Sequence, residues 1–329
     1  YKNFAPLPIY EITMKLQTQI PLKKQPHNQI DYNSKLFLVG SCFSENIGNK
    51  LNYFKFRATQ NPFGILFNPK AIEIFITNAI NKKVYSESDL VFQNERWHCF
   101  DAHSSLSSSN KNELLENLNS AIVSTNKKLQ EASHIIITLG TAWVYRYIET
   151  DKFVANCHKI PQKKFLKELL TVDEITESLE AIIVLLKSIN SNVNIIFTVS
   201  PVRHLKDGFI ENTQSKAHLI AGIHATINAR KNIHYFPSYE LMVDELRDYR
   251  FYAEDMIHPN ATAINYIWEK FTDTWFSAET SSTLKEIDTI QRGILHRPFN
   301  ENSAEHQQFL EKLASKKEKI KEQFSFINF

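Results

Sequence analysis

Short apolar runs alternate with longer helical patterns along this chain, and that alternation is the strongest constraint on its fold. The apolar runs are residues 35–39, 133–139, 194–199 and 233–236. Alternation of this kind is typical of βαβ units, in which the strands form a parallel sheet with right-handed crossovers. We therefore predict an α/β fold with a central parallel sheet.

The first apolar run leads directly into a serine. Gly40 turns the chain after residues 35–39, and Ser41 precedes helical spacing over 42–51. A side chain at such a junction lies in the crevice where open α/β sheets hold ligands, beside unpaired N–H groups and the positive end of a helix dipole. These features suit a nucleophile whose reaction creates an oxyanion, so we predict that role for Ser41. A purely structural N-cap is the alternative.

Asp255 and His258 supply a carboxylate and a base on one short loop near the other end of the chain. A serine hydroxyl is barely ionised at neutral pH and needs a base to take its proton. We predict that His258 takes this proton, while Asp255 holds the other imidazole nitrogen and stabilises the imidazolium. The alternative for this pair is a solvated loop before a helix, with Asp255 and Pro259 as its start signals.

Six motifs follow one another along the chain: GSCF, SENIG, NPFGILFNP, NCHKIP, TVSPV and DMIHPN. In this order they resemble the GSCFA-domain proteins, a branch of the SGNH/GDSL hydrolase superfamily, over residues 14–275. The resemblance implies a three-layer αβα sandwich with a flavodoxin-like parallel sheet. It also implies a catalytic triad of Ser41, His258 and Asp255.

The resemblance further implies an oxyanion hole with three donors. These are the nucleophile's own N–H, a glycine N–H after the second strand, and an asparagine side chain after the third. Gly64 takes the place of the glycine, but Ala142 stands where the asparagine belongs. Loss of one such donor costs about 10²–10³ in rate. Asn61 and Asn156 are the candidate substitutes, and a turn asparagine is the alternative for each.

Four further side chains are candidates for binding a substrate: His103, His158, Arg203 and Trp143. The two histidines fall between predicted strands, and Arg203 follows the run 194–199. Trp143 would offer a flat surface on which a sugar can stack. Exposed loop histidines without a role, and a core or rim position for the tryptophan, are the alternatives.

Two other chemistries are weaker hypotheses. Cys42 follows Ser41, and a helix N-terminus lowers the pKa of a thiol, although an inert buried cysteine is the commoner case. A metal site would need four ligands from His98, Cys99, His103, Cys157 and His158, whose spacing matches no ligand motif. We predict neither a metal nor a cofactor.

The overall composition excludes several classes of partner. The net charge is +2, from 38 basic and 36 acidic residues, so nothing indicates binding to nucleic acid or an acidic membrane. No apolar stretch has the length of a membrane span, and no signal-peptide pattern opens the chain. The three cysteines contain no CxxC pair and favour a reducing, cytoplasmic location. The sequence leaves the oligomeric state open.

The chain divides into three predicted parts. Residues 1–13 are interpreted as an extension before a natural start at Met14, and residues 14–279 as the SGNH-like GSCFA domain. Residues 280–329 are interpreted as a C-terminal helical appendage, which ends in a charged helix and offers a possible assembly surface. Within the domain, period-two spacing predicts a strand over 54–60. Residues 91–100 read as a hairpin, residues 148–170 as a loop region and residues 213–229 as a helix.

These observations together favour an enzyme. We expect a serine-dependent hydrolase of small acyl esters, such as O-acetyl groups on carbohydrate, as the superfamily suggests. An O-acyltransferase would use the same triad, with a sugar hydroxyl in place of water. A ligand-binding protein that keeps the fold without efficient catalysis is the rival from another class, and Ala142 is the observation that motivates it.

Overall fold

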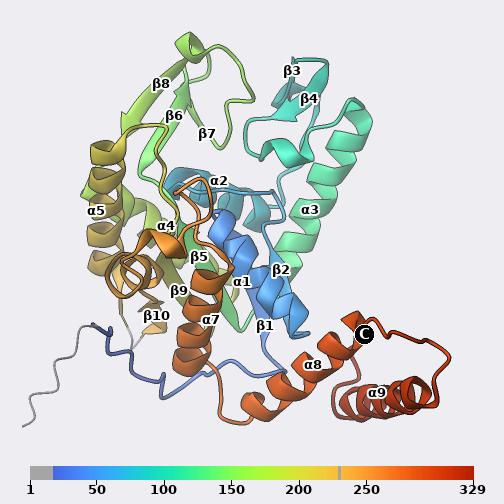
Figure 1. Cartoon of the computed structure of the whole chain (residues 1–329). Coiled ribbons are helices and arrows are strands. Elements are labelled where there is room, and N and C mark those ends of the chain that lie inside the picture. The colour runs from blue at the N-terminus through green and yellow to red at the C-terminus, as the bar shows by residue number, and fades with distance from the viewer. Residues whose placement is uncertain (1–17, 229–230) are drawn as a thin grey trace, which may run out of the picture.

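A five-stranded parallel sheet forms the centre of the computed structural model, which describes residues 18–228 and 231–329 (Figure 1). Across the sheet the strands run β10-β9-β5-β1-β2, and every neighbouring pair is parallel. Numbered along the chain, this order is 2-1-3-4-5, that of flavodoxin-like folds. The predicted α/β fold is therefore confirmed. The strands are β1 (Lys35–Gly40), β2 (Arg57–Gln60), β5 (His134–Leu139), β9 (Asn194–Val199) and β10 (Ile233–Tyr235).

Helices cover both faces of the sheet, because side chains alternate between two hydrophobic cores along each strand. Phe37 and Val39 of β1 face one core, and Leu36 and Leu38 face the other. Helices α2, α3, α4 and α5 contribute to the first core, and α1 and α7 contribute to the second. The result is a three-layer sandwich. The helices are α1 (Cys42–Tyr53), α2 (Pro69–Ile80), α3 (Lys111–Glu131), α4 (Val172–Ile189), α5 (Phe209–Thr226), α6 (Ser238–Glu240) and α7 (Ala261–Trp275).

Two small antiparallel sheets accompany the central one and project above it in Figure 1. One is a hairpin of β3 (Leu90–Gln93) and β4 (Arg96–Cys99), as the sequence predicts. The other joins β6 (Trp143–Tyr147), β7 (Lys152–Val154) and β8 (Phe165–Leu169). The loop expected over 148–170 was therefore wrong in part. Within this range, β7 and β8 form strands because they pair with β6. Local composition does not reveal that pairing.

Two expected boundaries move. The strand expected over 54–60 is confined to β2, because Lys55 has φ +62° and a left-handed residue cannot continue a strand. Phe54 instead ends α1 and stacks on Trp268 at 5.7 Å. Helix α5 begins at Phe209, directly after Gly208, rather than at residue 213.

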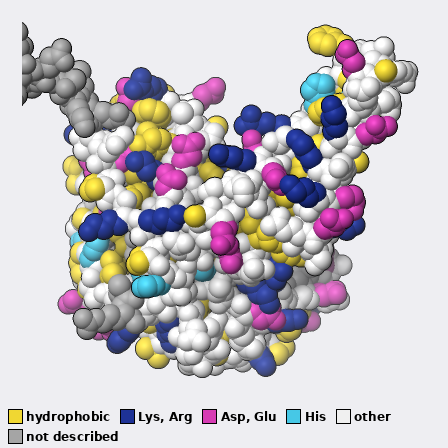
Figure 2. Space-filling view, turned by 90° about the horizontal axis from the view of Figure 1, so that it is seen from below, with side chains coloured by type: hydrophobic (Ala, Val, Ile, Leu, Met, Phe, Trp, Pro, Cys, Tyr) yellow, Lys and Arg dark blue, Asp and Glu magenta, His cyan; other side chains and the backbone are white. Residues whose placement is uncertain are grey.

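The C-terminal region is helical, as predicted, and consists of α8 (Thr280–Leu295) and α9 (Ala304–Gln323). Tyr53 of α1 anchors α8, since its hydroxyl donates to Asp288 and its carbonyl accepts from Gln291. Ile287 and Ile290 of α8 share a core with Ile320 of α9. Figure 2 shows this region as an arm that stands away from the body, with a hollow between the two.

The chain before β1 is extended. Residues 18–34 cross the body, and Ile30 forms a bridge with Phe276 after α7. The extension expected at residues 1–13 lies outside the described residues. In the two described segments, no helix combines the length and the apolar character needed to cross a membrane.

Gly40 offers a test of the packing between β1 and β5. Its φ is +144°, and a Cβ there would lie 2.2 Å from the carbonyl oxygen of Thr138. We predict that Gly40→Ala lowers the free energy of unfolding by about 3 kcal/mol or more, because the backbone of β5 cannot move aside. Urea denaturation measures this change.

Gly48→Ala is the matched control, because its Cβ would meet a side chain rather than backbone: the terminal amide of Gln60, which can rotate away, and the Gln60 Cβ at 3.1 Å. We expect a change within about 1 kcal/mol, since alanine is the better helix former. Equal losses of unfolding free energy in Gly40→Ala and Gly48→Ala would contradict the prediction that close packing of Gly40 on β5 causes the loss.

Candidate functional site

Ser41 lies at the carboxyl end of β1 and caps α1. Its Oγ accepts a hydrogen bond from the N–H of Phe43 at 3.2 Å, and its own N–H donates to Thr138 O of β5 at 3.0 Å. Ser41 is only 1% exposed. The N-cap role that the sequence offered as an alternative is therefore present. The hydroxyl is held at the positive end of the helix, beneath neighbouring side chains.

Asp255 and His258 meet on the loop that precedes α7. Asp255 Oδ2 lies 2.6 Å from His258 Nδ1, and Oδ1 accepts from the backbone N–H groups of Ile257 and His258. These hydrogen bonds, those from His258 first, lower the pKa of Asp255 to about 2. A proton on Nδ1 that faces this carboxylate leaves Nε2 as the proton acceptor. The predicted pairing of acid and base is thus present in the structure.

The segment after β9 holds this loop at the same edge of the sheet as Ser41. The Arg203 N–H donates to Ile257 O at 3.3 Å, its Nη1 to Met256 O at 3.4 Å, and its guanidinium lies 4.4 Å from the ring of Tyr252. Arg203, a predicted substrate-binding residue, therefore supports the Asp255–His258 loop directly.

His204 fills the space between that loop and β5. A Cβ at Gly140, which follows β5, would lie 2.8 Å from His204 Nε2. The ring packs 5.3 Å from that of Phe67, and its buried Nε2 has no hydrogen-bond partner in the part of the chain that the structure describes. Burial lowers the pKa of His204 to about 3, with smaller contributions from Lys216 and His258. No hydrogen bond joins Ser41 Oγ to His258 among the described residues.

Lys216 is the functional candidate that the sequence analysis missed. It projects from α5 into the body, is 1% exposed, and donates through Nζ to Gly140 O and Ser200 O, each at 2.7 Å. These two carbonyls follow β5 and β9, at the edge where Ser41 lies. Burial lowers the pKa of Lys216 to about 7, and an interaction with Cys42 opposes that shift. Its place on the apolar stripe of α5, beside Leu219, was the available signal.

Asn61 has the free donor among the predicted oxyanion-hole residues. Its Oδ1 accepts from the N–H of Gly40 at 2.9 Å, and its Nδ2 is buried without a partner in the described segments. The N–H of Gly64 donates to Asn61 O at 2.8 Å, and that of Ser41 is bound to Thr138. Both backbone donors that the resemblance implied are therefore already engaged.

Asn156 and the backbone N–H of Ala142 already have hydrogen-bond partners. Asn156 Oδ1 accepts from the N–H of His158 at 2.8 Å, which closes a turn. Ala142 is fully buried, and its N–H donates to Ser215 Oγ at 2.7 Å.

The other predicted binding residues have structural partners. His158 is buried, bonds Cys99 O through Nε2 at 2.8 Å and stacks on His98 at 4.5 Å. Its pKa falls to about 4 because of burial. His103 is less enclosed, packs over Gly64 and accepts at Nδ1 from the N–H of Ser105.

Trp143 lies on β6 and is partly buried. Its indole N–H donates to Glu211 O at 3.4 Å, and the ammonium of Lys167 lies 4.3 Å from its ring.

The three cysteines are free thiols. Burial raises the pKa of Cys42, the opposite of what a thiolate nucleophile needs. Burial also raises the pKa of Cys99 to about 12 and that of Cys157 to about 11. Within residues 18–228 and 231–329, no group of three or more His, Cys, Asp or Glu side chains is placed to hold a metal ion.

Two protein-family models match this chain. The model of the GSCFA family matches residues 35–271, from the first residue of β1 into α7. The chain belongs to the GSCFA family. A second model, described as the C-terminal domain of GSCFA domain proteins, matches residues 287–329. No curated protein matches the chain. In this GSCFA protein the family region contains Ser41, Lys216 and the Asp255–His258 pair.

The lowered pKa of Lys216 predicts that the stability of the GSCFA protein depends on pH. Its pKa is about 7 when folded, against about 10.4 in an unfolded chain. Below about pH 7 both states are charged, and the cost of burying the charge is fully present. Between the two pKa values the unfolded state binds more protons, so stability rises with pH.

We predict that the free energy of unfolding of the wild type gains up to about 1.4 kcal/mol per pH unit, relative to Lys216→Met, between about pH 7.5 and 10. Urea denaturation at several pH values measures both slopes. Parallel curves for the two proteins would show that the ammonium keeps an ordinary pKa in the fold.

Proposed function

We propose that this GSCFA protein is a serine-dependent acyl-ester hydrolase of the SGNH/GDSL kind. Small acyl esters, such as O-acetyl groups on carbohydrate, are its proposed substrates. The observation that carries the proposal is the Asp255–His258 pair, whose 2.6 Å contact directs Nε2 away from the carboxylate. Ser41 lies at the same edge of the sheet, at the start of α1.

The proposed reaction has two halves. His258 Nε2 takes the proton of Ser41 Oγ as that oxygen attacks the ester carbonyl carbon, and Asp255 stabilises the imidazolium. The tetrahedral oxyanion collapses, the C–O bond to the alcohol breaks, and the alcohol leaves with the proton from His258. Water then attacks acyl-Ser41, gives a proton to His258 and releases the carboxylic acid, while Oγ regains its proton.

The oxyanion requires hydrogen-bond donors beside Ser41. The resemblance placed two of them on backbone N–H groups that here bond Thr138 and Asn61. We propose that Asn61 Nδ2 serves instead, because its Oδ1 accepts from Gly40 and its amide hydrogens have no partner among the described residues. The N-terminus of α1 and the nearby ammonium of Lys216 add positive potential at the same edge.

Catalysis by this site requires a local rearrangement. Ser41 is 1% exposed, and its Oγ is bonded to the N–H of Phe43. Attack on a substrate means exchanging that bond for one to His258, which lies on a half-exposed loop with 47% of its side chain accessible. Hydrogen bonds of this kind often form only in the complex with substrate.

Two other functions share the site. An O-acyltransferase would follow the same first half-reaction and transfer the acyl group to a sugar hydroxyl. A ligand-binding protein is favoured by one observation: the backbone donors of Ser41 and Gly64 are engaged, and Ala142 replaces the expected asparagine. The experiments below separate a reactive serine from an inert one.

A fluorophosphonate probe tests the nucleophile. We predict an adduct on Ser41, located by peptide mass spectrometry, and none in Ser41→Ala. His258→Ala should slow labelling by about 10²-fold or more, because the hydroxyl loses its base. Asp255→Asn should also slow labelling, since the imidazole loses the carboxylate that holds it.

His27→Ala is the matched control, because that histidine is exposed and lies in the extended segment before β1. Its labelling should equal that of the wild type. Cys42→Ala should also label normally, because a thiol mechanism is not expected. A folded protein that acquires no adduct at Ser41 would favour the binding protein.

The Asn61 side chain can be tested by an isosteric change. Asn61→Asp keeps an acceptor for Gly40 and replaces the free Nδ2 donor by oxygen. We predict that kcat for an acyl ester such as p-nitrophenyl acetate falls by about 10²-fold or more, with little change in KM. Stopped assays over a range of ester concentrations separate the two constants.

Asn156→Asp is the matched control, because Asn156 uses only its Oδ1, to close a turn. Its kcat should stay close to that of the wild type. If Asn61→Asp retains full kcat while remaining folded, the oxyanion donor lies elsewhere.

A further inference from the structure

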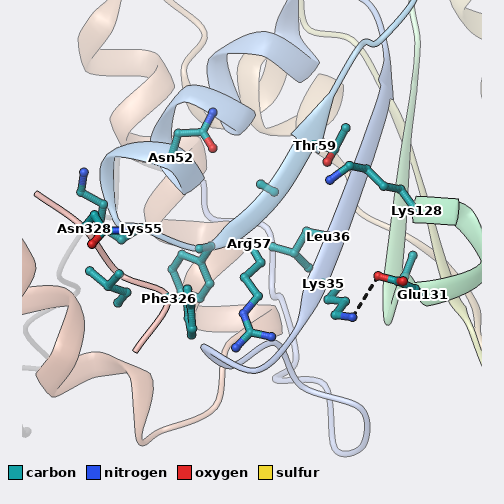
Figure 3. Close-up of a pocket in the computed structure, with 14 residues that line it drawn as sticks. Lys35, Leu36, Asn52, Lys55, Arg57, Thr59, Lys128, Glu131, Phe326 and Asn328 are labelled. Carbon is teal, nitrogen blue, oxygen red and sulfur yellow. Dashed lines mark hydrogen bonds and ion pairs between the residues drawn. The ribbon is translucent and has the colours of Figure 1, made fainter. Parts of the chain in front are cut away.

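A hollow on the protein surface lies near the opposite end of the sheet from Ser41. It has a volume of about 510 Å³ and lies beside β2, the edge strand of the central sheet (Figure 3). Its walls come from the first residues of β1 and β2, the last turn of α3, and residues 326–328. Ser41 follows the carboxyl end of β1, so the hollow and the candidate active site are separated by the length of that strand.

Basic side chains dominate the charge of this hollow. Four cations line it: Lys35, Lys55, Arg57 and Lys128. Lys35 is paired with Glu131 at 3.0 Å, and Figure 3 draws this ion pair as a dashed line. In the described segments the other three have no carboxylate within 4.0 Å. Three cations without an ion pair in the described segments, around one cavity, are a local excess of positive charge in a chain whose net charge is +2.

An aromatic ring positions the central cation. The guanidinium of Arg57 lies 3.9 Å from the ring centroid of Phe326. Cation–π contact of this kind restricts the side chain before any ligand arrives. Figure 3 shows Lys128 extending from α3 toward Thr59 of β2, so cations approach the hollow from two different elements.

The rest of the lining is mixed, because apolar residues alternate with the polar side chains of Asn52, Thr59 and Asn328. Leu36, Phe56 and Ala132 are buried core residues at the cavity wall, and Ile327 closes it from the C-terminal segment. Cavities of this size with an apolar wall and a few convergent polar groups are typical of small-molecule sites. Arg57 can bind phosphate or carboxylate oxygens through two parallel hydrogen bonds, which lysine cannot do.

We propose that this hollow is a binding site for a small organic anion. A phosphate or carboxylate group would meet Arg57, Lys128 would add positive potential from the α3 side of the hollow, and the apolar part of the ligand would lie against Phe326. The site goes beyond the proposed esterase function, and its test does not depend on that function. If the cations served only to discourage pairing of the β2 edge with another strand, no ligand would bind.

Isothermal titration of the full chain tests the proposal, with phenyl phosphate as the probe at constant ionic strength. We expect saturable binding that weakens by about tenfold or more in R57Q/K128Q, because the bidentate contact of Arg57 and the positive potential of Lys128 are lost. K312Q/K316Q removes the same charge from exposed lysines of α9 and should bind like the wild type. Circular dichroism confirms that each variant is folded.

Two further arms identify what the hollow recognises. Phe326→Ala should weaken phenyl phosphate more than inorganic phosphate, if the ring of the ligand uses the apolar wall. His258→Ala should leave phenyl phosphate binding unchanged, because His258 belongs to the other site. The proposal is overturned if millimolar phenyl phosphate gives no saturable heat, if K312Q/K316Q weakens binding equally, or if His258→Ala abolishes it.

Discussion

The buried ammonium of Lys216 links two strand ends at the edge of the sheet where the candidate active site lies. Lys216 reaches from α5 to the carbonyls of Gly140 and Ser200, which follow β5 and β9. Beside it, Ser41 N–H extends the ladder between β1 and β5 by bonding Thr138 O. Three neighbouring strands therefore end in fixed positions. The serine, the oxyanion candidate and the support for the Asp255–His258 loop all depend on this arrangement.

At this edge of the sheet, positive charge lies in the interior and negative charge lies on the outer loop. At and below about pH 7, the charge of Lys216 and the N-terminus of α1 lie in the interior, where water cannot screen them, and Asp255 carries its negative charge on the half-exposed loop. His204 lies between them and stays neutral because burial lowers its pKa. A charge that develops on a reacting oxygen beside Ser41 would therefore meet positive potential from the protein side.

The sequence could predict features that local pattern determines, but it could not predict those that depend on distant partners. Apolar runs and turn residues located β1, β5 and β9, and the spacing of Asp255 and His258 predicted their contact. Strands β7 and β8 were missed because they exist only through pairing with β6. Lys216 was missed because its partners, the carbonyls of Gly140 and Ser200, are brought beside it only by the folding of the sheet. The engagement of the Gly64 N–H depends on the conformation of one turn, which composition alone does not fix.

The segment after α9 lies beside β2, the edge strand of the central sheet. Ile327 is buried in the core beneath α1 and α7, and the ring of Phe324 lies 4.9 Å from that of Tyr32. An open edge strand such as β2 is a template for aggregation. By placing apolar residues and cations along this edge, the chain protects its own sheet from pairing with strands of other molecules.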